Sequence, residues 1–360
     1  MQTGYDVVVL GGGPAGLAAA IAIRRQIQAR VLVADAGPAL RERFGESASG
    51  ELLIHLDRLG LLEQFRTGPH MPCPGSASIW GGGQIGYNDY ILSPHGPAWR
   101  LQRAAFDGLL VSAARAAGVD LRWEMRFLHG RPAAGGHLLA LRSARGTHEV
   151  TAGLVVDATG PAARFATRAG ARRLPGQRLY AIARYAGIRA GAMTMQTLLE
   201  ADRDGWWYAV RLPDQRVLAL FVGDAAALRR LRADDHGAFE HALSATRLVG
   251  PALGGLALGE KVYHTTTITT DRLDCPAGEG WLAVGDAAAS YDPIIAWGLT
   301  KALEDGVMAG RQIAQGPGRA ERYVARMEER FHTYASIRAR LYALERRDGP
   351  FWQRCRAALA

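Results

Sequence analysis

The chain has 360 residues, 48% hydrophobic and 21% charged, a globular composition that excludes a disordered protein and a single small module. No apolar run approaches the roughly 20 residues of a membrane-spanning helix, so we expect no integral membrane segment. The net charge is +9, from 43 basic and 34 acidic residues, yet only Lys261 and Lys301 are lysines. This excess of arginine is typical of a biased base composition, and we expect no nucleic-acid partner.

The cysteines and histidines predict neither a disulfide framework nor a metal site. Cys73, Cys275 and Cys355 show no CxxC spacing, and the ten histidines form no HxH or HExxH group. A strand-like segment begins at Tyr5, which predicts that no signal peptide precedes the fold. We therefore expect a reduced, cytoplasmic protein.

The predicted elements follow one another as alternating helices and strands. In chain order they are a strand–turn–helix–strand unit in the first 35 residues, a helix at about 40–66, strands and turns at about 71–98, a helix at about 101–117, strands at 119–125 and 153–160, an antiparallel sheet from 175 to about 270, a strand at 281–285 and a helix after Gly298. Apolar residues three and four apart from Val324 to Leu344 predict a long amphipathic helix. We expect this helix to pack across the protein, with docking on a membrane surface as the alternative.

This succession predicts an α/β fold with a Rossmann-like nucleotide-binding domain, an inserted antiparallel-sheet domain and C-terminal helices. The chain leaves the nucleotide fold at about residue 71 and returns to it twice. The predicted boundaries are 1–70, 98–170 and 271–315 for the nucleotide-binding domain, 71–97 and 171–270 for the substrate domain, and 316–360 for the C-terminal helical segment.

The glycine turn after the first strand has a dinucleotide-binding pattern. Gly11, Gly13 and Gly16 fit GxGxxG between an apolar strand and an alanine-rich helix. Gly11 makes the tight turn, Gly13 lets the backbone approach a pyrophosphate, and Gly16 lets helix and strand pack closely. The helix N-terminus favours the phosphate charge. A second strand ends in Asp35, nineteen residues after Gly16, and that carboxylate is placed to accept hydrogen bonds from a ribose.

A second match to GxGxxG, Gly81–Gly86, lacks this context. A strand-like stretch and Ser93-Pro94 follow it, in place of a helix that could bind a phosphate. We interpret it as a glycine-rich loop of the substrate domain. The chain then has one dinucleotide fingerprint and no separate nicotinamide domain.

Four ordered motifs make the chain similar to a known family. Besides the fingerprint they are Gly45-Glu46-Ser47, the Asp157–Gly160 turn and Gly285-Asp286-Ala287-Ala288. Over nearly its whole length the chain resembles the FAD-dependent monooxygenase superfamily with the hydroxybenzoate-hydroxylase-type fold, and within it the flavin-dependent halogenase-like branch. It is similar there to flavoproteins that modify tryptophan in tryptophylquinone maturation, through the segments Gly68–Gly75, Ser78–Gly81, Trp99–Asp107 and Gly205–Tyr208.

The resemblance implies FAD as the cofactor and a set of residues that bind it. These are Gly11, Gly13, Pro14, Ala15, Gly16, Asp35, Ala36, Arg43, Glu46, Ser47, Arg103, Asp157, Gly160, Gly285, Asp286, Pro293, Gly298 and Leu299. Asp286 would bind the ribityl hydroxyls, and Arg103 would reach the phosphate or ribityl side of the flavin. The helix after Gly298 would stabilise negative charge on the reduced flavin. Asp157 is either close to the cofactor or a structural cap of its turn.

The resemblance also implies hydroxylation of an electron-rich aromatic ring, indole- or tryptophan-like and either free or peptide-borne, through a flavin C4a-hydroperoxide. The candidate catalytic residues are His70 or His95 as the base, Pro293 as the wall over the flavin, and Trp207 in the substrate pocket.

Three alternatives stay open: halogenation, another flavin redox reaction, and a non-catalytic role in maturation. Halogenases of this branch use a tunnel lysine, which residues 1–260 lack and which an always-protonated arginine cannot replace. Their WxWxIP motif is degenerate here, with Arg211 in the position of proline. The turn Asp157–Pro161 is similar to that of relatives that receive electrons from a separate flavin reductase, so we expect such a partner.

Overall fold

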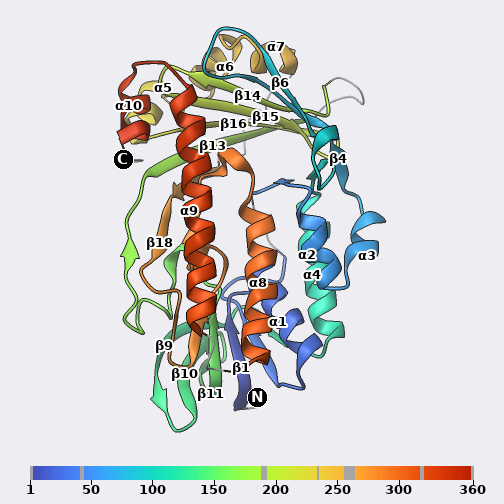
Figure 1. Cartoon of the computed structure of the whole chain (residues 1–360), viewed down its shortest axis with the longest axis vertical. Helices are drawn as coiled ribbons and strands as arrows, with labels where there is room; N and C mark the ends of the chain where they lie inside the picture. Colours follow the sequence, from blue (N-terminus) through green and yellow to red (C-terminus); the bar gives the residue numbers. More distant parts are fainter. Residues whose placement is uncertain are drawn as a thin grey trace. The chain divides into compact units, whose positions relative to one another are not determined.

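The structure is a computed structural model that describes residues 3–40, 44–187, 193–232, 235–254, 264–316 and 320–357. The chain forms two compact units, each built from three segments and each described here by itself (Figure 1). Unit 1 comprises Met1–Gly68, Arg103–Pro175 and Asp271–His332, and unit 2 comprises Pro69–Gln102, Gly176–Thr270 and Thr333–Ala360.

Unit 1 is organised around a mostly parallel sheet with the strand order β19-β20-β11-β1-β2-β8. The strands β20, β11, β1, β2 and β8 run parallel to one another, while β10 and β9 extend β11 as an antiparallel arm. Their bounds are β1 Gly4–Leu10, β2 Val31–Ala34, β8 Asp120–Arg122, β9 Arg126–Ala133, β10 Gly136–Ser143, β11 Gly146–Asp157, β19 Ala277–Gly278 and β20 Trp281–Ala283. The strands β2 and β20 and the second half of β1, Val7–Leu10, are fully buried apolar runs, as expected where both faces of a parallel sheet are covered.

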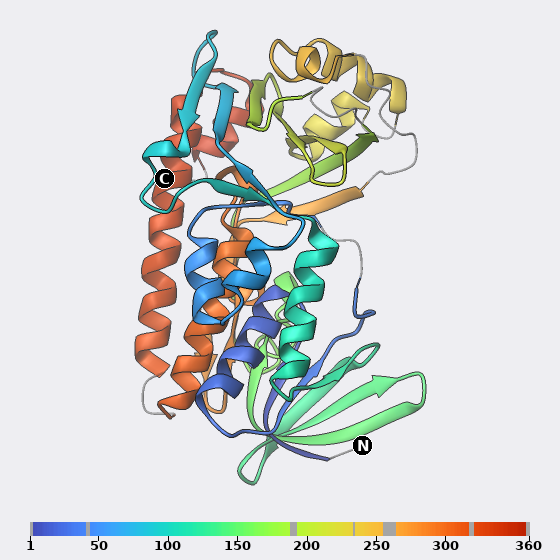
Figure 2. The same cartoon turned by 90° about the vertical axis from the view of Figure 1, so that its right-hand side faces the viewer.

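Helices α1, α4 and α8 of unit 1 lie side by side (Figure 2). Their bounds are α1 Pro14–Gln26, α4 Arg103–Ala116 and α8 Gly298–Ala314, and the short helices α2 Leu52–Arg58 and α3 Leu62–Arg66 take the place of the single helix expected at about 40–66. Small residues bring α1 and α8 close together, since a Cβ added at Gly306 would lie 2.5 Å from the Cβ of Ala18. Unit 1 also contains the short strands β3 Ser47–Ala48, β12 Arg173–Leu174, β18 Asp271–Leu273 and β21 Ala289–Ser290.

Unit 2 contains a sheet with the order β17-β13-β16-β15-β14-β5-β6, antiparallel except where β14 and β5 pair in parallel. The bounds are β5 Gly75–Ile79, β6 Gly86–Asp89, β13 Arg178–Gly187, β14 Thr197–Asp202, β15 Gly205–Arg211, β16 Arg216–Gly223 and β17 His264–Thr269, and β4 Met71–Cys73 pairs with β7 Ala98–Arg100. Helices α5 Ala225–Leu231, α6 His236–Ser244 and α7 Val249–Leu253 interrupt the stretch that the sequence pattern assigned wholly to strands.

The two neighbouring tryptophans of β15 lie on opposite faces of this sheet, because side chains alternate along a strand. Trp207 packs against Phe221 and Phe239, with ring centroids 4.9 and 5.1 Å apart. Trp206 packs against Trp80 on the other face and donates its indole N–H to Tyr342 at 3.2 Å. Both sheet faces of unit 2 are therefore covered by aromatic side chains.

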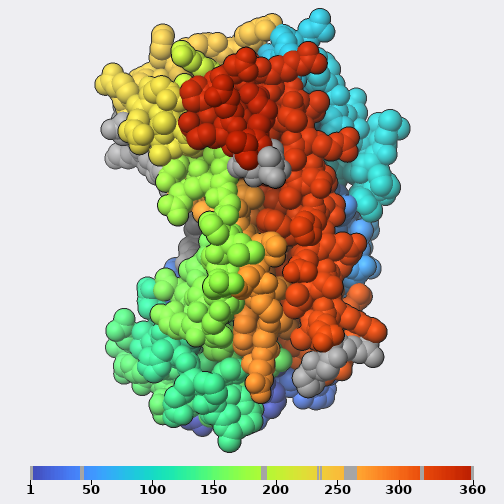
Figure 3. All heavy atoms as spheres, turned by 60° about the vertical axis from the view of Figure 1, so that its left-hand side comes forward, coloured from blue at the N-terminus to red at the C-terminus, as the bar shows by residue number. Residues whose placement is uncertain are grey.

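The predicted C-terminal amphipathic helix is present as α9, Ala320–Leu344, followed by α10, Pro350–Ala357. It differs from the prediction in one respect: residues 316–360 are not a separate segment, because the first half of α9 belongs to unit 1 and the second half, with α10, to unit 2. Figure 3 shows α10, in dark red, at the surface beside the yellow residues near α5, where Arg354 pairs with Asp224.

None of the helices in the described ranges is both long and apolar enough to cross a membrane.

Candidate functional site

The candidate site lies at the carboxyl edge of the parallel sheet of unit 1 (Figure 1). Four strands end there, and each is followed by one of the sequence motifs: β1 by Gly11, β2 by Asp35, β11 by the turn after Asp157 and β20 by Gly285. In open α/β sheets, ligands bind outside the carboxyl ends of the strands. The fold therefore gathers motifs that lie far apart in the sequence.

The fingerprint turn has the close backbone packing that a pyrophosphate loop needs. Gly11 has a φ of +114°, and a Cβ added there would lie 2.1 Å from the carbonyl oxygen of Ala158. A Cβ on Gly16 would lie 2.0 Å from the carbonyl oxygen of Gly11. Gly13 precedes α1, whose first residue is Pro14, so the N–H groups of that first turn are directed at the sheet edge. These residues fit the phosphates of a dinucleotide.

Asp35 is 6% exposed and holds the fingerprint turn with its carboxylate. One oxygen accepts the backbone N–H of Gly12 and the other that of Gly37, both at 2.7 Å. Each carboxylate oxygen can accept a second hydrogen bond. The residue therefore fits its predicted role at a ribose, while Ala36 lies exposed beside it.

Arg103 organises the Gly45-Glu46-Ser47 turn through its guanidinium. It donates to the carbonyl oxygens of Phe44 and Gly45, the latter at 3.0 Å, and it pairs with Asp107 at 3.3 Å. The buried Glu46 accepts the N–H of Gly45 at 3.1 Å. Arg103 was predicted to reach the flavin directly, whereas the contacts of its guanidinium described here shape the backbone of the turn.

Two further predicted residues belong to this turn. Ser47 begins β3 and is partly exposed. Arg43 lies outside the described residues, so its predicted role stays a prediction.

Asp157 is fully buried and caps the turn that follows β11. One carboxylate oxygen accepts the N–H and hydroxyl of Thr159, at 2.9 and 2.7 Å. The other accepts the N–H groups of Phe165 and Ala166, at 2.9 and 2.8 Å. Of the two interpretations given above, these contacts support the structural cap. Gly160 follows with a φ of +70° and open space around the position of a Cβ.

The Gly285-Asp286 turn is held by a buried cluster of charged residues that contains Asp305 and Arg330. The N–H of Gly285 donates to the fully buried carboxylate of Asp305 at 2.7 Å, and Asp305 pairs with Arg330 of α9. Burial lowers the pKa of the Arg330 guanidinium, but the negative charges of Asp305 and Glu304 raise it by more, so the net shift is upward. The turn is therefore fixed by a buried carboxylate that is itself paired with a buried guanidinium.

The side chain of Asp286 is half exposed at the same edge, in keeping with its predicted role at the ribityl chain. Arg173 donates to its carbonyl oxygen at 2.7 Å and pairs with Asp271 at 2.7 Å. Burial lowers the pKa of Arg173, while Asp271 opposes that shift. The 2% exposed ammonium of Lys301 lies 3.6 Å from carboxylate oxygens of both Asp286 and Asp305.

The N-terminus of α8 supplies the remaining predicted contacts. Gly298 is the first residue of the helix, is exposed, and has no atom within 4 Å of the position of a Cβ, while Leu299 is buried behind it. Pro293 is exposed in the 3₁₀ turn Pro293–Ile295, which Asp292 caps through the N–H of Ile294 at 3.0 Å. This helix end is open and carries the positive end of the helix dipole.

The other predicted catalytic residues, His70, His95 and Trp207, belong to unit 2. The Nδ1 atom of His70 accepts the backbone N–H of Gln102 at 3.2 Å, which places the ring proton on Nε2, and burial lowers the pKa of His70 to about 4. Both features weigh against a role as a base, which needs a pKa near the working pH. His95 is exposed in the loop after the 3₁₀ turn Tyr90–Leu92.

Trp207 corrects one prediction. Its side chain is fully buried in the core of unit 2, and its indole N–H donates to Asp202 at 2.9 Å. The neighbouring helices, which the sequence pattern did not predict, cover that sheet face, and so Trp207 is a core residue of unit 2.

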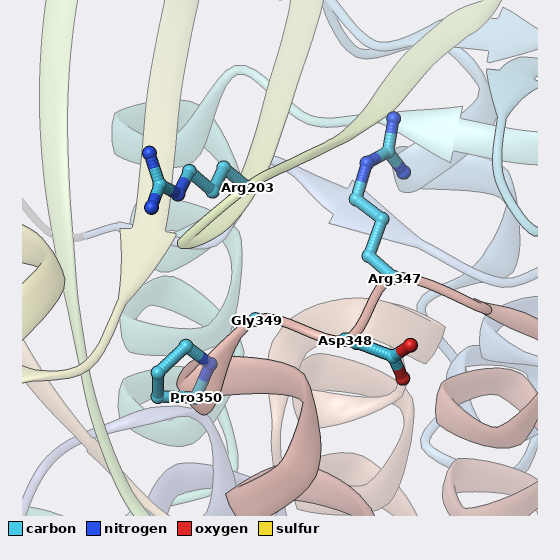
Figure 4. A pocket seen from close by; sticks show the side chains of 5 residues that line it. All are labelled: Arg203, Arg347, Asp348, Gly349 and Pro350. Atoms are coloured by element: carbon cyan, nitrogen blue, oxygen red, sulfur yellow. The ribbon is translucent and has the colours of Figure 1, made fainter.

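Unit 2 also contains an open pocket of about 520 Å³ before α10 (Figure 4). It is lined by Arg203, Arg347, Asp348, Gly349 and Pro350, and none of these residues was predicted to be functional. Arg347 pairs with Glu345 at 2.7 Å, and Asp348 lies 3.7 Å from Arg356. The charges of this pocket are thus partly satisfied within the chain.

Sequence reasoning missed the residues that support the turns: Arg173, Lys301, Asp305 and Arg330. A signal was present for two of them, since Lys301 and Asp305 are charged residues four apart on the apolar face of an amphipathic helix. Charged groups on a buried face need partners, and that pattern predicts an ion pair under the turn.

Comparisons with known proteins agree with this geometry. The chain is 25% identical to LodB from Marinomonas mediterranea, described as an FAD-dependent oxidoreductase, over 97% of this chain and 96% of LodB. It is 25% identical to the 1H-pyrrole-2-carbonyl-[peptidyl-carrier protein] brominase of Pseudoalteromonas luteoviolacea, over 86% of this chain and 77% of the brominase. The solved structure of the peptidyl tryptophan dihydroxylase QhpG is similar with a TM-score of 0.78 and 28% identity, covering 98% of this chain and 78% of QhpG.

The family comparison settles the cofactor. The FAD binding domain family matches residues 4–238, which include the fingerprint, Asp35, Arg103 and the turn after Asp157. The carboxyl-edge site of unit 1 has the acceptors and the open helix end that FAD needs. The predicted superfamily, fold class and cofactor are thereby confirmed, and this chain belongs to the FAD binding domain family of flavin-dependent oxidoreductases.

Proposed function

We propose that this protein is an FAD-dependent monooxygenase that hydroxylates an electron-rich aromatic ring, a tryptophan-type indole carried on a peptide or free. The observation that carries the proposal is the 28% identity to the peptidyl tryptophan dihydroxylase QhpG over 98% of this chain. The resemblance to LodB over almost its full length is compatible with the same class of flavoprotein.

The lysine content favours hydroxylation over halogenation. Residues 1–260 contain no lysine, so the segment after the Gly45-Glu46-Ser47 turn cannot supply the amine that tunnel-lysine halogenases use. Lys301 is 2% exposed, between Asp286 and Asp305, which suits a structural ion pair. The likeness to the brominase keeps halogenation as the second candidate.

Bound in its reduced form, FAD supplies two electrons to dioxygen, so that one oxygen atom enters the aromatic ring and the other leaves as water. The chain positions and protects this chemistry. Asp35 and the fingerprint turn hold the adenosine and phosphate end, and Asp286 takes the ribityl hydroxyls. The open N-terminus of α8 at Gly298 stabilises negative charge on the isoalloxazine ring.

The proposal includes a separate flavin reductase as electron donor. The single valid fingerprint is taken by FAD, and the Gly81–Gly86 match is followed by β6 and a 3₁₀ turn, with no helix N-terminus for a second dinucleotide.

The test supplies FAD, a flavin reductase with NADH as its electron source, and dioxygen. The substrates offered are tryptophan, a tryptophan-containing peptide or a tryptophan-containing partner protein, and the products are analysed by mass spectrometry. Hydroxylation adds the mass of oxygen, and the added atom becomes labelled when ¹⁸O₂ is used. A chloride- or bromide-dependent exchange of hydrogen for halogen would replace this proposal with halogenation. Flavin oxidation without any product from these substrates would count against both.

A further inference from the structure

Trp123 lies beside Gly12 and Asp35, although no motif includes it. It follows β8, the strand that pairs in parallel with β2, and β2 is followed by Asp35. The carboxyl ends of parallel neighbours meet at one sheet edge, so Trp123 and Asp35 leave adjacent strands side by side.

The backbone on both sides of Trp123 is fixed to the segment that contains Asp35. The N–H of Asp35 donates to the carbonyl oxygen of Arg122 at 2.9 Å, and the N–H of Met125 donates to the carbonyl oxygen of Asp35 at 2.7 Å. Glu124 donates to the carbonyl oxygen of Gly37 at 3.0 Å and has a φ of +55°, unusual for a residue with a side chain. This turn holds the intervening indole in one place.

The indole covers the fingerprint turn itself. A Cβ added at Gly12 would lie 2.4 Å from Cζ3 and 2.8 Å from Cη2 of Trp123, and 3.2 Å from the Cβ of Asp35. The six-membered part of the ring therefore rests on the backbone between Gly11 and Gly13. The side chain is only partly buried, which leaves part of the ring for another contact.

We propose that Trp123 binds the adenosine half of FAD by stacking on or against the adenine. Asp35 is predicted to accept hydrogen bonds from the hydroxyls of the adenosine ribose. Because that ribose is bonded to the adenine at one end and to the pyrophosphate at the other, the adenine must lie within a few ångströms of the Asp35 carboxylate. The backbone hydrogen bonds of Arg122 and Met125 to Asp35 place the aromatic ring of Trp123 beside this carboxylate. It makes the site selective for FAD over flavins that lack adenosine.

The test measures binding in solution with three probes: FAD, ADP and riboflavin 5′-phosphate. Base–aromatic stacking is worth about 1–3 kcal/mol, so Trp123→Ala is expected to weaken FAD and ADP binding by about 5- to 150-fold. Binding of riboflavin 5′-phosphate is expected to stay unchanged, and Trp123→Phe to restore most of the affinity for ADP.

Tryptophan fluorescence distinguishes a direct contact between Trp123 and the adenine from a purely structural role of Trp123. ADP is expected to quench part of the tryptophan fluorescence of the apoprotein, and this quench should disappear in Trp123→Phe at ADP concentrations that saturate the variant. Unfolding of each apo variant is followed alongside to establish that the fold is retained. Equal loss of affinity for all three probes, unchanged affinity for ADP in Trp123→Ala, or a quench that persists in Trp123→Phe would overturn the proposal.

Discussion

The chain contains the pattern GxGxxG twice, once in each unit, and the two copies fold differently. Gly11–Gly16 joins β1 to α1, whereas Gly81–Gly86 joins β5 to β6 through bends and contains no helix. In both copies a buried carboxylate accepts a glycine N–H, from Gly12 to Asp35 at 2.7 Å and from Gly81 to Glu345 at 3.0 Å. The two copies therefore share the glycines and an acidic partner, and they differ in the helix N-terminus, which is the part of the motif that binds a phosphate.

The difference lies in what surrounds the last glycine. A Cβ on Gly16 would meet the backbone of Gly11 at 2.0 Å, because α1 packs tightly on the turn. At Gly86 the nearest atom to such a Cβ is 3.9 Å away, on an exposed edge strand. Only the first copy needs glycine at this position for helix–strand packing, and only there does a helix N-terminus follow.

The largest expected effect comes from substituting these two glycines as a matched pair. Gly16→Val is expected to abolish FAD binding, because the side chain clashes with the backbone of Gly11 and displaces the start of α1. Gly86→Val is expected to retain full FAD absorbance, with the free energy of unfolding within about 0.5 kcal/mol of the parent. Flavin absorbance after purification measures both, and Cys275→Ala serves as a further control that keeps the cofactor. Full FAD occupancy in Gly16→Val would show that the pyrophosphate is not at this turn.

The second prediction concerns whether the Gly81–Gly86 copy binds a nicotinamide nucleotide. We expect slow reduction of the bound flavin by NADH or NADPH alone and much faster turnover with a reductase or free reduced flavin. Anaerobic stopped-flow mixing measures this directly. Bleaching at about 10 s⁻¹, an ordinary turnover rate, would reveal a nicotinamide site. If Gly86→Val then slowed that bleaching, the site would be at the second copy.

A third experiment removes the acidic partner from each copy in turn. Asp35→Ala is expected to weaken FAD binding by about 1–3 kcal/mol, since the N–H groups of Gly12 and Gly37 and the ribose lose their acceptor. Glu345→Ala removes the acceptor of Gly81 and the partner of Arg347, so it is expected to lower the free energy of unfolding by a similar amount and to leave FAD affinity unchanged. Calorimetric titration with FAD and chemical denaturation of both variants distinguish the two outcomes.

The last prediction is a pH dependence that arises in both units and is small at neutral pH. Burial lowers the pKa of His55 in unit 1 and of His70 in unit 2 to about 4 in each case. The unfolded chain therefore binds more protons than the folded chain below about pH 6.5. The free energy of unfolding is thus highest above that pH and decreases as the pH falls towards 4. We expect His55→Gln and His70→Gln each to flatten the fall in the free energy of unfolding on acidification.

The nucleotide-binding part of the fold was predictable because it is local in sequence. An apolar strand, a glycine turn, an alanine-rich helix and Asp35 follow one another within the first 35 residues, and their spacing alone predicts β1, α1 and β2. The heptad-like spacing from Val324 to Leu344 likewise predicts α9.

The remainder depends on contacts between distant segments, which a single sequence does not display. From the sequence, Trp207 was predicted to line the substrate pocket. In the folded chain, α6 places Phe239 against its ring, which makes Trp207 a core residue. Arg103 has the charge to reach a phosphate, but the carbonyls of Phe44 and Gly45 come within its range only in the folded chain. Trp123 belongs to no motif, and its position depends on the pairing of β8 with β2.

The close packing of α1 on α8 has a consequence for biosynthesis. Helix α1 ends at Gln26 and its partner α8 begins at Gly298, so at about 5–20 residues per second the ribosome needs on the order of tens of seconds to deliver the second helix. During that interval the alanine face of α1 that will meet Gly306 and Gly310 has no α8 to cover it. The strand before Gly285 and the open helix end at Gly298 are also still to be made. A nascent chain can therefore complete its cofactor site only after the ribosome has passed Gly298.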